Sequence, residues 1–240
     1  MATYQIRLKS KKEIADGTMA FYFEKPAGFT YKAGQYAEFK LIDPKETDEE
    51  GNGRAFSLAN APYQEDIMFA TRMRDTAFKR NLKNMETGAE LTMEGPSGSF
   101  TLPNNTKSPV VFLSGGIGIT PMHSMLLQAA HDKTEHKLFL FYANNSPKTT
   151  AFLDDLLTAR KENPNFTFVP SMTKLEGTGE KWEGETGFFR EELLKKYLPD
   201  LSAPIYFISG PASMVSSIRK TLTDAGIDDD NIRTEEFAGY

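Results

Sequence analysis

The sequence contains no cysteine among its 240 residues. Disulfides, cysteine-ligated zinc and cysteine-ligated iron–sulfur clusters are therefore excluded within this chain. Histidine is also scarce, with His123, His131 and His136 as the three examples. The first two lie eight positions apart on one expected helix, which favours surface or packing roles. We therefore expect no metal site.

Long apolar runs and a surplus of basic charge are missing too. The first ten residues do not resemble a signal peptide, and no stretch of about 18 apolar residues exists to span a membrane. From these features we expect a cytoplasmic protein without a membrane span. The net charge of -5 argues against nucleic acid as the main partner.

The composition that is present is that of an ordinary globular protein. Hydrophobic residues make up 39% of the chain and charged residues 25%, and the length suffices for two modest domains. The densest charge run, at residues 43–50, is expected to be a solvated loop between two strands. A docking patch for a basic redox partner is the alternative for this run.

Residues 1–104 show short alternating runs that are separated by turn-forming residues. This pattern is typical of an antiparallel β-barrel, here expected to be Greek-key-like and to form the N-terminal domain. The expected strands are Tyr4–Lys9, Thr18–Glu24, Gln35–Leu41, Arg54–Leu58, Asp66–Arg72 and Glu90–Glu94, and one short helix is expected at Phe78–Met85.

Residues 105–240 instead alternate compact apolar strands with helices. Such an order predicts a C-terminal α/β domain, in which a parallel sheet carries helices on both faces. The expected strands are Val110–Ser114, Leu138–Asn144, Phe166–Met172 and Ile205–Ser209. One helix is expected to begin at Pro121, and three more are expected at Ala151–Asn163, Glu191–Leu198 and Pro211–Ala225.

A glycine-rich turn joins the first of these strands to its helix. Gly115, Gly116 and Gly118 would let a diphosphate approach the backbone, where the helix start offers N–H groups to an anion. Thr120 is expected to cap the helix, and Pro121 suits its first turn. Tight packing of helix on strand also needs small residues, so the turn alone leaves both interpretations open. Its spacing differs from the Rossmann G-x-G-x-x-G.

Five motifs occur in the order typical of the ferredoxin–NADP reductase superfamily, and the resemblance covers nearly the whole chain. They are Arg54-Ala55-Phe56-Ser57, the G-P-x-G-x-F turn at residues 95–100, the glycine turn GGxGxTP, Ser209-Gly210-Pro211-Ala212-Ser213-Met214, and the tail Glu235-Glu236-Phe237-Ala238-Gly239-Tyr240. The resemblance implies that the barrel binds FAD and that the α/β domain binds NADH or NADPH. An FMN-binding branch is the alternative for the flavin.

For the barrel, the resemblance implies that Arg54 holds the flavin diphosphate, for which its guanidinium fork is suited. Phe56 would stack on the isoalloxazine, unless it is an ordinary core residue, and Ser57 would hydrogen-bond flavin N5. Lys79 stands where relatives often have serine, and a lysine still serves a phosphate as a point charge. The further implied cofactor contacts are Ala55, Thr71, Arg72, Met73, Ala77 and Phe78.

For the α/β domain, Ser209 replaces the cysteine that many relatives place beside the reacting carbon of nicotinamide. The resemblance implies that Phe237 covers a face of the flavin. Tyr240 is the other candidate for this role, and a packing role is the alternative for either residue. Ser57, Ser209 and Phe237 form the implied catalytic set. Glu235 or Glu236 would relay a proton. The implied nucleotide contacts are Gly115, Gly116, Gly118, Thr120, Pro121, Asn144, Thr173, Ser209, Gly210, Pro211 and Met214.

The choice between NADH and NADPH stays open in the sequence. It depends on the group that meets the ribose 2′ position, commonly near the end of the second parallel strand. Residues 142–145 carry neither an acid nor an arginine there, and Lys174 after the third strand is the candidate for pairing with a 2′-phosphate.

The expected function is that of an FAD-dependent NAD(P)H oxidoreductase, which passes electrons from the flavin to a separate ferredoxin-, haem- or flavodoxin-like protein. A fused cluster that requires cysteine is excluded, so the acceptor protein would be another chain. Two alternatives remain: direct reduction of a small acceptor such as flavin, ferric chelate or quinone, and a flavin-binding regulatory or docking subunit with little turnover.

Overall fold

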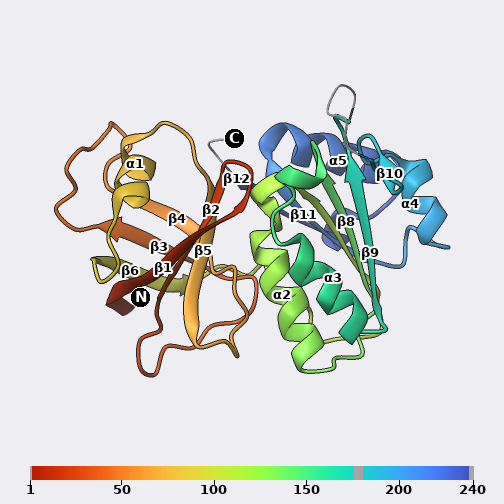
Figure 1. The fold of residues 1–240 in the computed structure, drawn as a ribbon. Coiled ribbons are helices and arrows are strands. Elements are labelled where there is room, and N and C mark those ends of the chain that lie inside the picture. Colours follow the sequence, from red (N-terminus) through yellow and green to blue (C-terminus); the bar gives the residue numbers. More distant parts are fainter. Residues whose placement is uncertain (1, 176–180, 238–240) are drawn as a thin grey trace. The chain divides into compact units, whose positions relative to one another are not determined.

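The chain forms two compact units in a computed structural model that describes residues 2–175 and 181–237 (Figure 1). The first unit comprises Met1–Leu102 with Thr120–Gln128, and the second comprises Pro103–Ile119 with Ala129–Tyr240. Each unit contains a six-stranded sheet. The expected combination of an antiparallel N-terminal sheet with a parallel C-terminal sheet is confirmed.

The first unit is an antiparallel, barrel-like sheet in the strand order β4-β3-β6-β1-β2-β5. The outer strands of this order approach each other just beyond β4, where the amide of Ala59 donates to the carbonyl of Met68 on β5, at 2.7 Å. The elements are β1 (Ala2–Ala15), β2 (Thr18–Glu24), β3 (Tyr36–Leu41), β4 (Gly53–Ser57), β5 (Asp66–Arg72), α1 (Ala77–Asn84) and β6 (Glu90–Ser97).

Aromatic rings fill the core of this unit. Phe69 on β5 is fully buried, and its ring centroid lies 4.4 Å from that of Phe56, 4.6 Å from that of Phe39 and 5.4 Å from that of Phe21. The alternation of apolar and polar residues in β3 and β2 turns these rings inward, as the period of a strand requires. Rings of this size account for much of the buried apolar area.

The second unit is a parallel sheet in the order β10-β9-β8-β7-β11-β12. Its strands are β7 (Val110–Gly115), β8 (Leu138–Asn144), β9 (Phe166–Met172), β10 (Glu185–Thr186), β11 (Ile205–Pro211) and β12 (Ile232–Phe237). Its helices are α3 (Leu153–Glu162), α4 (Glu191–Tyr197) and α5 (Ala212–Asp224), with 3₁₀ turns at η1 (Gly116–Gly118), η2 (Pro147–Thr149) and η3 (Asp229–Asn231). Helix α2 (Ile119–His131) is divided between the units.

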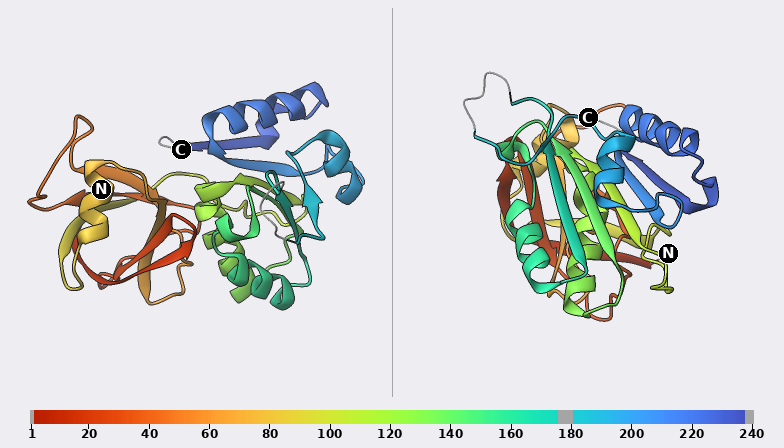
Figure 2. Two further views of the ribbon diagram at one scale, coloured as in Figure 1. Left: turned by 45° about the horizontal axis from the view of Figure 1, so that its top comes forward. Right: turned by 90° about the vertical axis from the view of Figure 1, so that its right-hand side faces the viewer.

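The strand order reverses between β7 and β11, because the chain first builds outward through β8 and β9 and then returns to the other side of β7. Open parallel sheets bind ligands at the carboxyl ends of the strands beside such a reversal. Helix α3 lies on one face of the sheet, and α4 and α5 lie on the other (Figure 2). The topology therefore predicts a ligand site at the turns that follow β7 and β11.

Several strands differ from the sequence prediction for identifiable reasons. Strand β1 continues to Ala15 through a lysine-rich segment that is mostly exposed, so it lacks the apolar alternation that marks a strand. Strand β12 lies at the edge of the parallel sheet and buries only Ile232, and β10 is two residues long. Strand β6 extends through residues 95–97, where a turn was predicted.

Replacement of Phe69 by alanine should lower the free energy of unfolding of the first unit by about 3–5 kcal/mol, because the cavity would adjoin four other phenylalanine rings. Urea unfolding followed by circular dichroism measures this loss. Ile42→Ala is the control, since Ile42 is 43% exposed in the same unit and should change stability by less than about 0.5 kcal/mol. Equal losses in the two variants would contradict the assigned core.

Candidate cofactor sites

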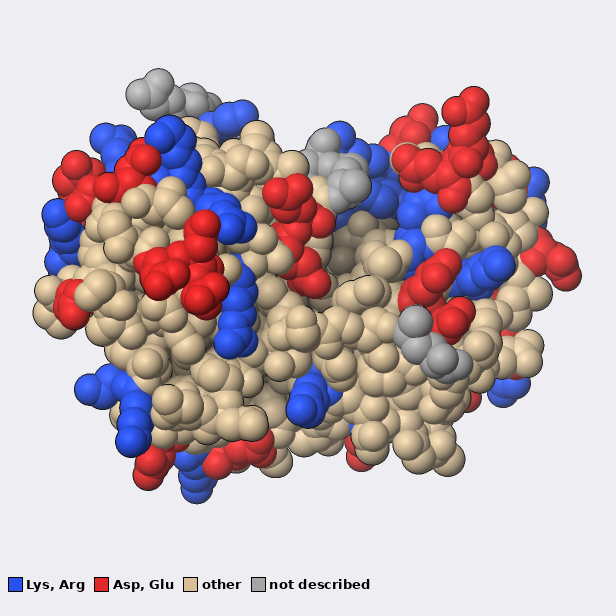
Figure 3. All heavy atoms as spheres, turned by 180° about the vertical axis from the view of Figure 1, so that it is seen from behind, with Lys and Arg blue, Asp and Glu red and all other residues tan. Residues whose placement is uncertain are grey.

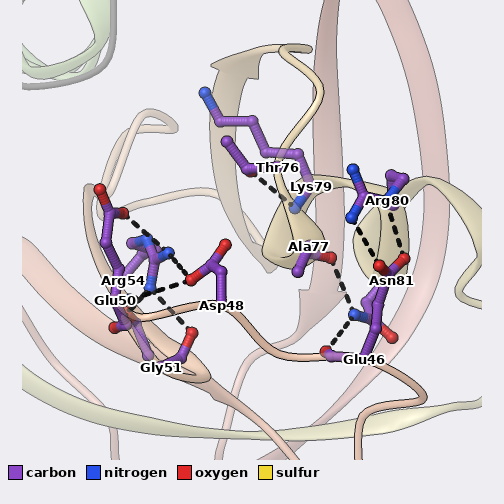
Figure 4. Close-up of polar contacts among 11 residues, drawn as sticks. Glu46, Asp48, Glu50, Gly51, Arg54, Thr76, Ala77, Lys79, Arg80 and Asn81 are labelled. Carbon is purple, nitrogen blue, oxygen red and sulfur yellow. Dashed lines mark hydrogen bonds and ion pairs between the residues drawn. The ribbon is translucent and has the colours of Figure 1, made fainter.

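Arg54 on β4 is held by a dense set of acceptors. Its Nη1 atom donates to the carbonyls of Glu50, Gly51 and Gly53 at 2.9, 3.0 and 2.7 Å. Its Nη2 atom pairs with a carboxylate oxygen of Asp48 at 3.0 Å and with one of Glu50 at 2.8 Å. Backbone carbonyls thus fix the guanidinium through Nη1, and Nη2 faces the two carboxylates (Figure 4).

Helix α1 lies beside the guanidinium of Arg54. The guanidinium of Arg54 lies over the ring of Phe78, 5.2 Å from its centroid. Thr76 caps the helix by accepting from the amide of Lys79 at 3.4 Å. Burial lowers the pKa of Lys79, and the nearby positive charges of Arg74, Arg54 and Arg72 lower it further. Several cations therefore lie close together at the start of a helix, which is where a diphosphate is favoured.

Asp48 lies among these cations. Burial by itself would raise the pKa of this carboxyl, but the hydrogen bond and charge of Arg54 and the backbone amides of Glu50 and Ala77 shift the pKa downward overall. The ionised carboxylate is therefore the stable form at this position. Residues 43–50 form the expected loop between β3 and β4, and most of them are exposed. Carboxylates of this loop also form ion pairs with Arg54 and Arg80, which the sequence did not predict.

The structure does not bring every predicted flavin residue to Arg54. Phe56 packs against Phe69 with nearly parallel rings, which is a core contact, whereas Ser57 is buried and lies on the opposite side of the strand. Met73 also packs against the core. The remaining predicted residues are Ala55, which is exposed, Thr71 and Ala77, which are buried, and Arg72, whose charge acts on Lys79.

In the second unit, the packing of the protein itself requires a glycine at position 118, just after β7. A Cβ atom on Gly118 would lie 2.6 Å from the Cα of Gly210 and would also clash with the carbonyl of Ser209, both on β11. A Cβ on Gly115 would strike the sulfur of Met214. Gly116 has φ of 53°, in the left-handed region that favours glycine. The turns after β7 and β11 are therefore packed directly against each other.

A row of buried polar groups crosses the carboxyl ends of three neighbouring strands. Ser209 on β11 is in register with Ser114 on β7 and with Glu235 on β12. The hydroxyls of both serines and one carboxylate oxygen of Glu235 are buried without a hydrogen-bond partner among the described residues. Buried polar groups normally have partners, so this row is suited to receive polar groups of a ligand. Burial raises the pKa of Glu235 to about 7.

The ends of β8 and β9 carry the other predicted nucleotide contacts. Asn144 is buried, and its side-chain amide has no hydrogen-bond partner in the part of the chain that the structure describes. The amide of Thr173 donates to the carbonyl of Asn144 at 2.8 Å, and the hydroxyl of Thr173 donates to the same carbonyl at 3.1 Å. Lys174 follows with an exposed side chain.

Helix α2 begins earlier than expected. It starts at Ile119, directly after η1, so Thr120 lies within the first turn rather than capping it, and Pro121 also lies in that turn. Further along, His123 is buried, and its Nδ1 atom lies 2.6 Å from the carbonyl of Ala59. Within residues 2–175 and 181–237, no group of His, Asp and Glu side chains is placed to hold a metal ion.

The C-terminal tail belongs to the parallel sheet up to its last described residue. Phe237 is in register with Pro211 of β11, at the end of the nucleotide motif. Gly210 precedes Pro211 with φ of 156°, and Met214 lies close to the same turn. The rival of Phe237, Tyr240, lies outside the described residues.

Comparison with known proteins gives a consistent result. Residues 112–220 match the model of the oxidoreductase NAD-binding domain. The chain is 30% identical over 232 residues to a subunit of the Na(+)-translocating NADH-quinone reductase of Shewanella denitrificans, covering 90% of this chain and 56% of that protein. These matches agree with the predicted resemblance to the ferredoxin–NADP reductase superfamily.

Solved structures with a similar fold cover the chain almost completely. A ferredoxin NADP+ reductase from Neisseria gonorrhoeae with bound FAD and NADP has a TM-score of 0.80 and 21% identity, with 98% of each chain covered. The flavohem-like FAD/NAD-binding domain of nitric oxide dioxygenase from Vibrio cholerae has a TM-score of 0.81 and 19% identity, with 97% of this chain and 98% of that chain covered. At this level of sequence identity, both similarities show a shared fold.

These similarities agree with the expected class of protein, that of NAD(P)H oxidoreductases, and with FAD and a nicotinamide nucleotide as the expected cofactor classes. The chain spans about half the length of the curated relatives that it matches. None of the helices in the described part of the chain is long and apolar enough to cross a membrane.

Several functional candidates carry little signal in the sequence. Asp48 and Glu50 belong to a charge run, and only their separation of six and four residues from Arg54 hinted that they could reach it. Ser114 and Glu235 become neighbours of Ser209 through sheet pairing, and the strand that holds Glu235, β12, carries little apolar signal. Their alignment follows from sheet register, which a single sequence does not reveal.

Glu235 predicts a specific pH dependence of stability. Because its folded pKa of about 7 lies above the value of about 4.3 for an unfolded glutamate, the folded state holds the extra proton between these values and loses stability as the pH rises through them. Between pH 5 and pH 8 the wild type should lose on the order of 1–2 kcal/mol more than Glu235→Gln. Urea unfolding at both pH values measures the difference.

The exposed neighbour Glu236 provides the matched control, since Glu236→Gln makes the same chemical change one residue away. This variant should follow the pH dependence of the wild type. Parallel stability curves for the wild type and Glu235→Gln would show that Glu235 is not held protonated.

Proposed function

We propose that the chain is an FAD-dependent reductase, in which the first unit holds the flavin, the second holds NADH or NADPH, and electrons leave to a separate acceptor. The observation that carries this proposal is the cationic region around Arg54 at the start of helix α1. It is supported by the turns after β7 and β11, which meet at the strand-order reversal where α/β sheets bind nucleotides.

In this proposal the diphosphate of FAD binds the guanidinium of Arg54 and the N-terminal end of helix α1, with Lys79 as an additional positive charge. The structure fits such a group, since Arg54 is oriented by three backbone carbonyls and by the ring of Phe78 before any ligand arrives. A donor that is already oriented loses little conformational entropy on binding. FAD would supply the redox chemistry, accepting a hydride from the nucleotide and releasing electrons to the acceptor.

The nucleotide is proposed to bind at the turns that follow β7 and β11. Gly115, Gly116 and Gly118 bring the backbone and the helix start close to its diphosphate. The orphan hydroxyls of Ser114 and Ser209 and the carboxyl of Glu235 would provide hydrogen bonds for polar groups of the nicotinamide half. Ser57 and Phe237 keep their predicted roles beside the flavin, and Asn144 and Thr173 their predicted roles beside the nucleotide.

The acceptor is proposed to be another protein of the ferredoxin, haem or flavodoxin class. The superfamily includes reductases that serve such partners, and the cysteine-free chain offers no ligands for a cluster of its own. Lysine and arginine side chains alternate with acidic ones over the face shown in Figure 3, so this face offers no uniform basic surface for nucleic acid. The cytoplasmic location expected from the sequence stays a prediction, which cell fractionation tests.

Arg54→Ala should weaken FAD binding by about 10- to 100-fold, because the variant loses charge-assisted hydrogen bonds to the diphosphate. Flavin absorbance of the purified protein and titration of the flavin-free chain with FAD measure the effect. Arg7→Ala is the control, since Arg7 is an exposed arginine of the same unit that pairs with Glu90. Unchanged flavin content in Arg54→Ala would refute the phosphate role.

The reductase activity is tested by mixing the flavin-loaded chain with NADH or NADPH without oxygen. The yellow colour should bleach within the mixing time for at least one nucleotide, and the faster of the two identifies the physiological donor. A chain that cannot be loaded with FAD or FMN contradicts both enzyme alternatives. A yellow chain that neither nucleotide reduces favours a regulatory subunit, whereas rapid turnover with ferric chelate or quinone favours a small acceptor.

A further inference from the structure

An acidic strap, residues 43–50 between β3 and β4, lies against helix α1. The carboxylate of Glu46 forms two hydrogen-bonded contacts with the guanidinium of Arg80, at 2.8 and 2.5 Å. The side chain of Asn81 donates to the carbonyl of Glu46 at 2.9 Å and accepts from the amide of Lys45 at 3.1 Å. The strap is therefore attached to the second turn of the helix by both side-chain and backbone contacts (Figure 4).

The far end of the strap brings its carboxylates to Arg54. Asp48 contacts the guanidinium at 3.0 Å and accepts from the amide of Glu50 at 3.1 Å, while Glu50 contacts the same guanidinium nitrogen at 2.8 Å. The Arg54 side chain is 21% exposed and that of Asp48 31% exposed, so this contact is partly shielded from water. The Glu50 side chain is 77% exposed and contributes less.

We infer that the acidic strap is a built-in competitor for the anion site at Arg54 and controls the loading of the flavin. The inference rests on the proposed function, which assigns the diphosphate of FAD to this guanidinium. Asp48 provides an anionic carboxylate to the same donors that would bind a phosphate, namely the guanidinium and the start of helix α1. The strap thus imitates one phosphate of the ligand.

Competition follows from charge. A diphosphate placed beside Asp48 and Glu50 would meet two negative charges that already use the Nη2 donor of Arg54. Like charges at this separation repel, so the carboxylates must withdraw before the diphosphate gains the full interaction. The observed affinity for the ligand is then reduced by the fraction of molecules in which the strap is closed.

Because the strap is attached to helix α1 at Glu46, its far end can move away from Arg54 while the strap stays on the helix. Arg80 and Asn81 hold residues 45 and 46, whereas Asp48 and Glu50 lie beyond this anchor and contact Arg54 directly. Only the far end of the strap needs to move. The contact of Glu46 with Arg80 keeps the carboxylates near Arg54, which maintains their effective concentration as competitors.

The test measures anion binding to the flavin-free 240-residue chain by calorimetry, with inorganic pyrophosphate as the probe. Asp48→Asn should bind pyrophosphate about three- to tenfold more tightly than the wild type, because the amide retains the shape of the side chain without its charge. Glu50→Gln should shift affinity in the same direction by a smaller factor. Unfolding temperatures of all variants verify that each remains folded.

Glu49→Gln is the matched control. Glu49 is exposed in the same strap, and its replacement changes the net charge by the same amount as Asp48→Asn. Its affinity for pyrophosphate should stay within about twofold of the wild type, since the charge of an exposed side chain is screened by water and salt. Equal gains in Asp48→Asn and Glu49→Gln would show a general charge effect and overturn the competitor role.

A parallel titration with FAD separates this inference from the proposed function. If pyrophosphate affinity follows the expected order while FAD binds to no variant, the proposed function and the control of flavin loading both fail, and only the competition for the anion site at Arg54 stands. If FAD binds the wild type and neither Asp48→Asn nor Glu50→Gln tightens pyrophosphate, the competitor role is overturned and the function stands. Absence of pyrophosphate binding in every variant also overturns it.

Discussion

The ion pair between Arg54 and Asp48 is the interaction on which the properties of the first unit depend. It joins strand β4, the acidic strap and the start of helix α1 at one point, and the cation of Arg54 is oriented by backbone carbonyls around it. A guanidinium held in this way is prepared for an anion, whether that anion belongs to the chain or to a ligand. The local structure of this region, its electrostatics and the proposed cofactor binding thus all depend on Arg54.

The second unit depends on a different constraint, the close approach of the turns after β7 and β11. Gly118 leaves room for the carbonyl of Ser209, and sheet register places Ser114, Ser209 and Glu235 in one row at the strand ends. The same geometry leaves their polar atoms without partners among the described residues. The packing requirement and the proposed nucleotide role therefore coincide at the glycine turn, which explains why sequence alone did not separate them.

Much of the fold was predictable because its signals are local. Alternating runs located β2 and β5, and compact apolar runs located β8 and β9, at or near their observed bounds. The alternation of strands with helices located α3 and α5 within two residues. Strand β12 and the polar half of β1 lack such signals, since their neighbours in the sheet rather than their own residues make them strands. The motif around Arg54 predicted a cation for the flavin diphosphate, a role that stays a prediction. It did not predict the carboxylates that contact this guanidinium, because loop conformation is a tertiary property.

A crystal structure of the full chain grown with FAD tests the central claim most directly. The claim predicts that the diphosphate lies on the guanidinium of Arg54 at the start of helix α1, and that the carboxylate of Asp48 has withdrawn from that guanidinium while Glu46 remains on Arg80. A diphosphate bound elsewhere, with Asp48 still paired to Arg54, would contradict both the assigned flavin site and the competition for it.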